Sequence, residues 1–241
     1  MILFLKKVLQ IALFLLIGFI IVYFAKDKQN EKNLVAYYPF NGNANDESGN
    51  RNNCKIVGAS LANDRFQRKD SALYFDGVSN MLFADVKNLF ELSSPHTISW
   101  WYKIDTIQTY TDINGAGNMW ALVNADGGVG VQSGFRAPAY KTLGLDVWLW
   151  GGATLLQTNI PDVKLWHHCV YTFDSTIQRF YIDGKEVAKA KVSVRKGIVK
   201  QIMFGNYPDG DQYFKGNLDD VRIYNKALLP KEVENLFNAK S

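Results

Sequence analysis

Hydrophobic and polar positions divide the chain into one long apolar run near the N-terminus and a series of short alternating runs after residue 33. The short runs are rich in aromatic and β-branched residues and are bounded by Gly, Asn and Asp, a pattern typical of β-strands. The expected strands are 34–40, 72–77, 81–86, 97–104, 119–134, 146–152, 166–174, 179–192, 201–206 and 217–225. Short strands at this spacing predict an all-β fold in which two antiparallel sheets pack face to face as a sandwich.

Two tight turns and one helix complete the expected elements. Asp126-Gly127 and Asp183-Gly184 stand between apolar runs, and Asp-Gly tolerates the positive φ that two-residue hairpin turns require. Pro230 suits the first position of a helix. The apolar face of that helix would be formed by Val233, Leu236 and Phe237. We expect a short C-terminal helix that packs on the edge of the sandwich.

The apolar run covers residues 8–25 and contains one polar residue, Gln10. At ~1.5 Å per residue, a helix of this length just crosses a ~30 Å hydrocarbon core. Lysines flank the run on both sides, and Tyr23 and Phe24 stand where interfacial aromatic residues are common. A cleaved signal peptide is the alternative, but it needs small residues before the cut, and Tyr23 is bulky.

The chain is therefore expected to have four parts. Residues 1–25 form a transmembrane anchor, 26–33 a polar tether, 34–237 the sandwich and 238–241 a tail. A large domain after a short N-terminus favours a single-pass, N-in orientation, with the domain on the periplasmic or extracellular side.

Charge and cysteine content narrow the classes of partner. The net charge is +4, and residues 1–32 carry three of these positive charges. The nearly neutral body lacks the basic surface of a nucleic-acid-binding protein, so nucleic acid is excluded as a partner. Cys54 and Cys169 lie in separate segments. They are either two buried thiols or, in an oxidising compartment, one disulfide.

Several motifs appear in an order that resembles a laminin G-like domain of the concanavalin A-like jelly-roll superfamily, of the type common in bacterial surface proteins. The motifs are "YYPFNGNANDESGN", "ALYFDGVSNMLFA", "HTISWWYKID", "WHHCVYTFDSTIQRFYIDGKEVA" and "GNLDDVRIYNKALLPKEVENLF". The resemblance covers residues 34–237 and implies a jelly-roll sandwich. It is weak evidence for function, because this fold serves lectins, adhesins, adaptors and some enzymes.

The resemblance also implies that the first and last strands are neighbours, and that a structural Ca²⁺ lies near them. Carried onto this sequence, its ligands would be Asn41, Asn43 and Asp46 on the first loop, with Asp219 on the last strand. Hard oxygen ligands of this kind suit calcium. The alternative is that Asp46 makes a turn to its own backbone and that Asp219 pairs with Arg222 or a loop amide.

Catalysis is not expected. Glycoside hydrolases need two carboxylates ~5–9 Å apart across a cleft. Asp219 and Asp220 are adjacent in a strand, so they are expected to point to opposite faces. His167 and His168 are interpreted as strand histidines in packed or hydrogen-bonded positions, because no further metal ligands accompany them.

The segment around 107–160 matches the family loosely and is the expected ligand-binding surface. Its candidate residues are Trp120, Phe135, Arg136, Tyr140, Trp148 and Trp150. Trp148 and Trp150 share one face of their strand and Val147 and Leu149 the other. The tryptophans are therefore either core residues or a surface for a protein partner or a sugar.

These observations predict a membrane-anchored, non-catalytic binding module. The short tether favours an adaptor or accessory subunit of a membrane or envelope protein assembly, because a domain held so near the bilayer reaches few other partners. The alternative is a lectin-like module that binds envelope or external polysaccharide. A glycan hydrolase or lyase is the least favoured class.

Overall fold

The computed structural model describes residues 32–87, 89–104, 117–136, 144–149, 155–157, 162–194, 196–206, 208 and 212–239. The chain divides into two compact units, Met1–Leu34 and Val35–Ser241, and the second contains the sandwich. The expected membrane segment, 8–25, lies outside the described residues. Within the described ranges, no helix has both the length and the apolar character needed to cross a membrane.

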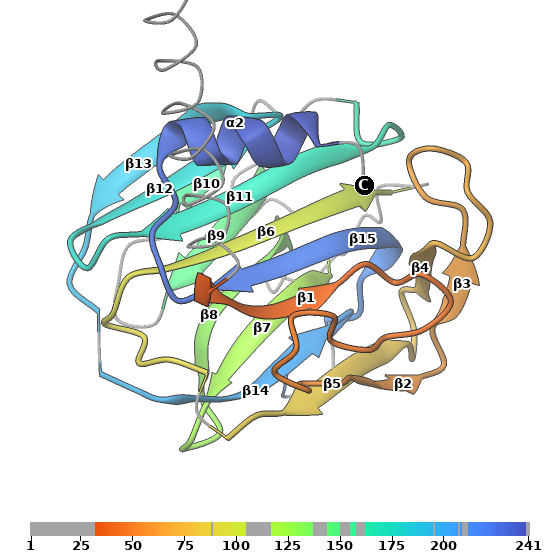
Figure 1. The fold of residues 1–241 in the computed structure, drawn as a ribbon, viewed down its shortest axis with the longest axis horizontal. Helices are drawn as coiled ribbons and strands as arrows, with labels where there is room; N and C mark the ends of the chain where they lie inside the picture. The colour runs from red at the N-terminus through yellow and green to blue at the C-terminus, as the bar shows by residue number, and fades with distance from the viewer. Residues whose placement is uncertain are drawn as a thin grey trace, which may run out of the picture. The chain divides into compact units, whose positions relative to one another are not determined.

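The second unit is built from two antiparallel sheets, as the alternating pattern predicted (Figure 1). Sheet A contains β13 (Lys185–Lys191), β12 (Ile177–Ile182), β11 (His167–Phe173), β6 (His96–Lys103), β15 (Lys215–Tyr224), β4 (Ala72–Asp76) and β3 (Ser60–Ala62) in this order. Sheet B contains β10 (Leu155–Gln157), β9 (Gly144–Leu149), β8 (Val129–Arg136), β7 (Asn118–Asn124), β14 (Val199–Phe204), β5 (Met81–Asp85) and β2 (Lys55–Val57). The first strand, β1 (Leu34–Tyr38), pairs with the last, β15, so the expected neighbourhood of the two ends of the domain is confirmed.

Both expected hairpins are present. Each divides a segment that was predicted as one strand, 119–134 or 179–192, into two strands. β12 and β13 are joined by Asp183 and Gly184, whose φ values are 49° and 77°. Both central residues are thus left-handed, the conformation that a two-residue turn between twisted strands requires. β7 and β8 are joined across residues 125–128. The three-residue strands β2, β3 and β10 were not predicted, because such short strands carry little periodic signal.

The core lies between the sheets and is rich in aromatic side chains. Trp100 of sheet A meets Trp120 of sheet B edge-on, with ring centroids 5.1 Å apart, and both are almost fully buried. An aromatic side chain buries roughly 150–250 Å², and at about 25 cal/mol per Å² this contributes on the order of 4–6 kcal/mol. The two cysteines are unpaired, and Cys169 is fully buried in this core.

Helix α2 (Pro230–Asn238) lies across the outer face of sheet A (Figure 1). It begins at the expected proline, and the Glu232 side chain accepts the N–H of Leu229 at 2.8 Å. Phe237 stacks on Trp101 of β6 with centroids 5.8 Å apart. The helix therefore covers the middle of the sheet and converts the outer side of β6 into a second buried layer.

Candidate functional site

The register of β9 settles which way Trp148 points. Val147 and Leu149 are fully buried in the core between the sheets. Trp148 lies on the outer face of sheet B, where it is half-buried against an apolar cluster that includes Val123 and Met203. Arg136 is the last residue of β8. Tyr140 and Trp150 lie outside the described residues.

Two expected ligand-binding residues belong to the core instead, which corrects the sequence interpretation. Trp120 is 1% exposed and Phe135 is 4% exposed. Phe135 meets Tyr102 of the opposite sheet edge-on at 5.5 Å. They face inward because of the registers of β7 and β8, which sequence spacing alone did not fix. Neither ring is available to a ligand on the surface.

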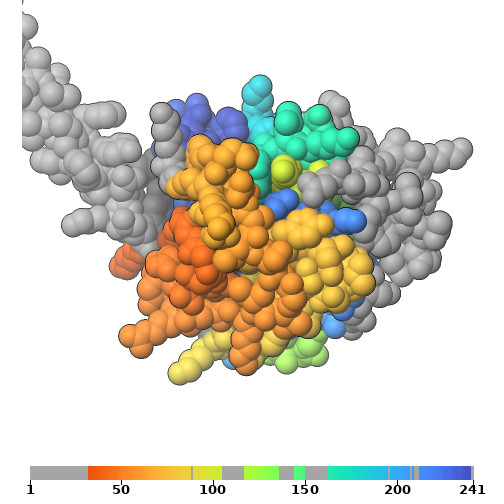
Figure 2. Space-filling view, turned by 90° about the vertical axis from the view of Figure 1, so that its right-hand side faces the viewer, coloured from red at the N-terminus to blue at the C-terminus, as the bar shows by residue number. Residues whose placement is uncertain are grey.

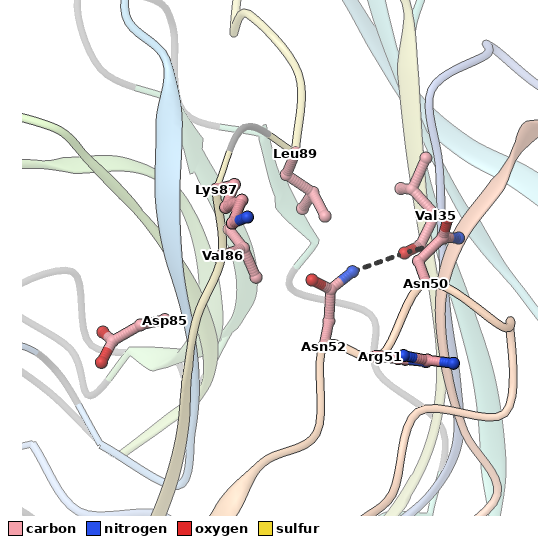
Figure 3. Close-up of a pocket in the computed structure, with 8 residues that line it drawn as sticks. All are labelled: Val35, Asn50, Arg51, Asn52, Asp85, Val86, Lys87 and Leu89. Atoms are coloured by element: carbon pink, nitrogen blue, oxygen red, sulfur yellow. Dashed lines mark hydrogen bonds between the residues drawn. The ribbon is translucent and has the colours of Figure 1, made fainter.

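A pocket of about 500 Å³ lies between the start of β1 in sheet A and the end of β5 in sheet B, with the segment that follows β5. This pocket was not predicted from the sequence. One wall is the start of β1 with the loop 50–52, and the other is residues 85–89 (Figure 3). The lining residues are Val35, Asn50, Arg51, Asn52, Asp85, Val86, Lys87 and Leu89.

Two asparagines on one wall are fixed by the same backbone carbonyl. The side-chain amide of Asn52 donates to the Val35 carbonyl at 2.9 Å, as Figure 3 shows. The amide of Asn50 donates to that carbonyl at 3.3 Å. The polar wall is therefore preorganised, which reduces the entropy lost when a ligand binds.

Asp46 holds this loop from behind. Its Oδ2 accepts the N–H of Asn52 at 2.9 Å, and its Oδ1 accepts the N–H groups of Tyr37 and Ser48, both at 2.9 Å. The last bond is the turn to its own backbone that was one of the two sequence alternatives. Asp46 thus ties the loop to β1 and sets the shape of the pocket wall.

The opposite wall combines two apolar side chains, Val86 and Leu89, with the charged residues Asp85 and Lys87. Val86 and Leu89 are 6% and 8% exposed. Their N–H groups donate to carbonyls of Lys200 and Val199, at 2.7 and 3.2 Å, so the segment continues beside β14. Apolar side chains facing a few fixed polar groups are typical of a small-molecule site.

The expected calcium ligands contact other protein groups in the structure. Asp46 is occupied by backbone donors as described above. Asn43 is exposed, and its Oδ1 accepts the N–H of Asn45 at 2.7 Å while its amide donates to the Asn41 carbonyl at 3.2 Å. Asp219 is paired with Arg65. Among the described residues, no group of three or more His, Cys, Asp or Glu side chains could hold a metal. The calcium site stays a prediction.

The expectation that Asp219 and Asp220 point apart is wrong. Their carboxylates converge on one guanidinium, with Arg65 Nη1 2.7 Å from Asp219 Oδ2 and Arg65 Nη2 2.5 Å from Asp220 Oδ2. A β-bulge between Asp219 and Arg222, with Asp220 at a φ of 50°, turns both carboxylates to the same side. Arg222 and the Tyr37 hydroxyl bind the other Asp220 oxygen at 3.1 and 2.8 Å.

These acids are structural. Burial and the neighbouring Asp220 charge raise the pKa of Asp219. Burial would also raise the pKa of Asp220, but Arg222 and Arg65 outweigh it and lower that pKa. Both side chains are nearly inaccessible to solvent, so they lack the open cleft that glycoside hydrolysis requires.

The adjacent histidines have different environments. His167 Nδ1 lies 2.8 Å from Asp183 Oδ2, and its Nε2 lies 2.9 Å from the Asp162 carbonyl. His168 Nε2 lies 2.8 Å from the Ser99 hydroxyl. This second pair is buried, and Phe237 of α2 stacks on the His168 ring at 6.1 Å. It resembles a nucleophile–base pair in distance only, because the helix closes it to substrate.

Comparisons with known proteins agree with this architecture. The family model described as "Concanavalin A-like lectin/glucanases superfamily" matches residues 73–234. An adhesion G-protein coupled receptor V1 of Danio rerio is 34% identical over 77 residues, which is 30% of this chain and 1% of that protein.

Solved structures with a similar fold include two saccharide complexes. Domain 4 of an extracellular arabinanase from Geobacillus stearothermophilus, in complex with arabinotriose, is 19% identical, with a TM-score of 0.61 over 86% of this chain and 98% of that one. A botulinum neurotoxin serotype D ligand binding domain, in complex with N-acetylneuraminic acid, is 14% identical, with a TM-score of 0.67 over 87% of this chain and 52% of that one. This chain therefore spans about half the length of that toxin domain.

Proposed function

Because the chain belongs to the concanavalin A-like lectin/glucanase superfamily, we propose that it is a non-catalytic carbohydrate-binding module. Its binding site is the pocket between β1, the loop 50–52 and residues 85–89. The observation that carries this proposal is the combination of two asparagine side chains fixed on one carbonyl with the apolar side chains of Val86 and Leu89 opposite them.

A pyranose or furanose ring has matching chemistry. Its hydroxyls exchange hydrogen bonds with amide and charged groups, and its C–H faces pack on apolar side chains. The saccharide complexes formed by domains of similar fold support the class of ligand. Because the identity of these domains to this chain is low, they support a similar fold but say nothing of the position of the site.

A binding role without hydrolysis fits the lining of the pocket. Asp85 is the one carboxylate among its lining residues, and its Oδ1 accepts the side-chain amide of Gln201 at 2.8 Å. Hydrolysis of a glycosidic bond generally needs a second carboxylate opposite the first. We expect saccharides to bind and be released unchanged.

A matched pair of substitutions tests the site. Asn50→Trp places a large ring in the pocket, and Asn45→Trp places the same ring on the same loop at an exposed position outside the lining. Binding of the full chain to an oligosaccharide panel should fall at least tenfold in Asn50→Trp and stay unchanged in Asn45→Trp. Equal binding by both variants would place the saccharide site elsewhere or reject the function.

A second candidate function is the adaptor or accessory subunit of a membrane or envelope assembly. The observation that favours it is a group of exposed apolar side chains where β2 and the β4–β5 turn meet, with Ile56, Val57 and Val78 exposed by 42%, 39% and 70%. Figure 2 shows this side of the molecule, where the orange segment that holds β2 and β3 covers much of the surface. Exposed apolar groups of this kind occur at protein–protein contacts.

In this second function, residues 8–25 anchor the chain N-in and hold the domain close to the bilayer. Extraction from native membranes in mild detergent, followed by size analysis and mass spectrometry, tests it. A stoichiometric companion that is lost in Val78→Asp would support the adaptor role. A lone monomer in the wild type would reject it and leave saccharide binding as the function.

A further inference from the structure

Arg51 is held at the pocket in a strained conformation. Its φ is 62°, in the left-handed region, and its side chain is exposed. A residue other than glycine in this region costs on the order of 1–3 kcal/mol, and such strain tends to cluster at functional sites. Glycine would adopt this conformation without a Cβ penalty, so the arginine at this position is not explained by the loop geometry.

The neighbours of Arg51 are what maintain this conformation. Asn50 and Asn52 flank it and both donate to the Val35 carbonyl, and Asp46 holds the Asn52 N–H. The backbone is thus fixed on both sides of Arg51. The loop therefore presents the backbone of Arg51 at the pocket in one conformation, while the exposed side chain keeps its rotamer freedom.

Positive charge is also present on the opposite wall. Lys87 lines the pocket, and the Lys200 ammonium donates to the Lys87 backbone carbonyl, which places a third cation beside this wall. Two carboxylates lie nearby. Asp46 is buried behind the loop and accepts three backbone N–H groups. Asp85 binds Gln201 and points away from the other lining residues in Figure 3.

We propose that the saccharide bound in this pocket is acidic, and that Arg51 and Lys87 bind its carboxylate. This inference rests on the proposed carbohydrate-binding function and names the class of sugar. The planar guanidinium pairs with a carboxylate through two parallel hydrogen bonds, and the lysine adds a point charge from the other wall. Asn50 and Asn52 then face the ring hydroxyls, and Val86 and Leu89 face its apolar side.

A pair of ligands that share the same sugar ring and differ in charge provides the first test. The probes are oligogalacturonides and their methyl esters, in which the carboxylate is masked and the ring is unchanged, with an oligosaccharide sulfate of similar length as a third probe. In isothermal titration of the full chain we expect the free acid to bind at least tenfold tighter than the ester. This preference should decrease as salt rises, because the charges at the pocket mouth are partly exposed to solvent.

Two substitutions assign the effect to the named residues. Arg51→Gly and Lys87→Ala should each weaken binding of the acid at least tenfold and leave binding of the ester nearly unchanged. Arg51→Gly should also keep or raise the melting temperature, because glycine relieves the strain at this φ. Loss of binding with no loss of stability separates a ligand contact from a structural role. Lys191→Ala, an exposed lysine at the end of β13, is the control and should change neither quantity.

Each other outcome rejects a defined part of the proposal. If acid and ester bind equally and Asn50→Trp abolishes both, the pocket binds sugar but the acidic class is wrong. If the acid is preferred but Arg51→Gly and Lys87→Ala have no effect, other residues of the protein bind the carboxylate. If the sulfate binds as tightly as the carboxylate, the carboxylate assignment fails. If no probe binds at all, both this inference and the proposed function fail for this class of polysaccharide.

Discussion

Asp219 and Asp220 show how one backbone angle decides the role of two side chains. In a regular strand they would point to opposite faces, but the left-handed Asp220 brings both carboxylates onto Arg65. With Arg222, the cluster contains two guanidinium groups and two carboxyl groups. Arg65 also lies over the Trp101 ring, 4.4 Å from its centroid. The cluster therefore joins the loop between β3 and β4 to the last strand.

Replacement of Arg65 by alanine should be strongly destabilising. It leaves two buried carboxylates with one remaining cation, and breaking a buried ion pair in this way typically costs about 3–5 kcal/mol. The free energy of unfolding from urea titrations measures the effect. Arg179→Ala is the control, because Arg179 and its partner Asp174 are 27% and 34% exposed, and surface pairs contribute about 1 kcal/mol or less. A loss below 1 kcal/mol for Arg65→Ala would show that the cluster is not structural.

The pKa values of two buried histidines, His96 and His168, predict how the free energy of unfolding depends on pH. Burial, the largest influence on each, lowers the pKa of His96 to about 4 and that of His168 to about 3. In the unfolded chain a histidine titrates near ~6.5. Below that pH the unfolded state binds protons that the folded state does not, so the free energy of unfolding falls as the pH falls.

Between pH 7 and pH 5 each of these two histidines should remove about 2 kcal/mol of stability. His168→Gln should remove about half of the combined change. His167 acts in the opposite direction: burial is the largest single influence and lowers its pKa, but the hydrogen bonds and charges of Asp183 and Asp162 together outweigh it and raise that pKa. The stabilisation that His167 contributes is complete below pH ~6.5 and is lost as the pH rises through the pKa of His167 in the folded state. Urea titrations at both pH values measure the slope, and a flat profile in the wild type would contradict the assignment.

At the scale of elements, the sequence predicted most of the fold and little of the site. Alternation and turn residues identified the long strands, the Asp183-Gly184 hairpin and the helix that begins at Pro230, because each signal is local. The bulge in β15 was missed because it is defined only by pairing with β6. The pocket was missed because Val35, Asn52 and Lys87 are far apart along the chain and meet through sheet packing. Trp120 and Phe135 were misplaced because aromatic content does not say which face a strand buries.

The first loop is the element where the calcium prediction can be decided. Arg65 already neutralises Asp219, so any calcium effect should depend on Asp46 and not on Asp219. We expect millimolar Ca²⁺ to raise the melting temperature of the wild type and of Asp219→Asn, and to have no effect on Asp46→Asn. The readout is the difference with and without calcium in each variant, so the intrinsic cost of either substitution cancels. An unchanged wild-type melting temperature would end the calcium assignment.

At the scale of the whole molecule, the pocket lies where parts of both sheets come together. Val35 belongs to β1 of sheet A, and Val86 follows β5 of sheet B. A ligand in this pocket contacts both layers at once. Because the sheets share one core, it can bind only while they are packed together, and its binding energy should add to the stability of the whole sandwich.

An acidic saccharide should therefore stabilise the protein against heat as well as occupy the pocket. At a concentration one hundred times its dissociation constant, a ligand specific for the folded state adds about 2.7 kcal/mol. For a domain of this size that corresponds to a rise in melting temperature of roughly 5–10 °C. Calorimetry of the full chain with the oligogalacturonide measures it, and Asn50→Trp, which blocks the pocket, should show no rise. A similar rise in Asn50→Trp would mean that the ligand stabilises the sandwich from a different surface, and the outer face of sheet B around Trp148 would then be the site to probe by substitution.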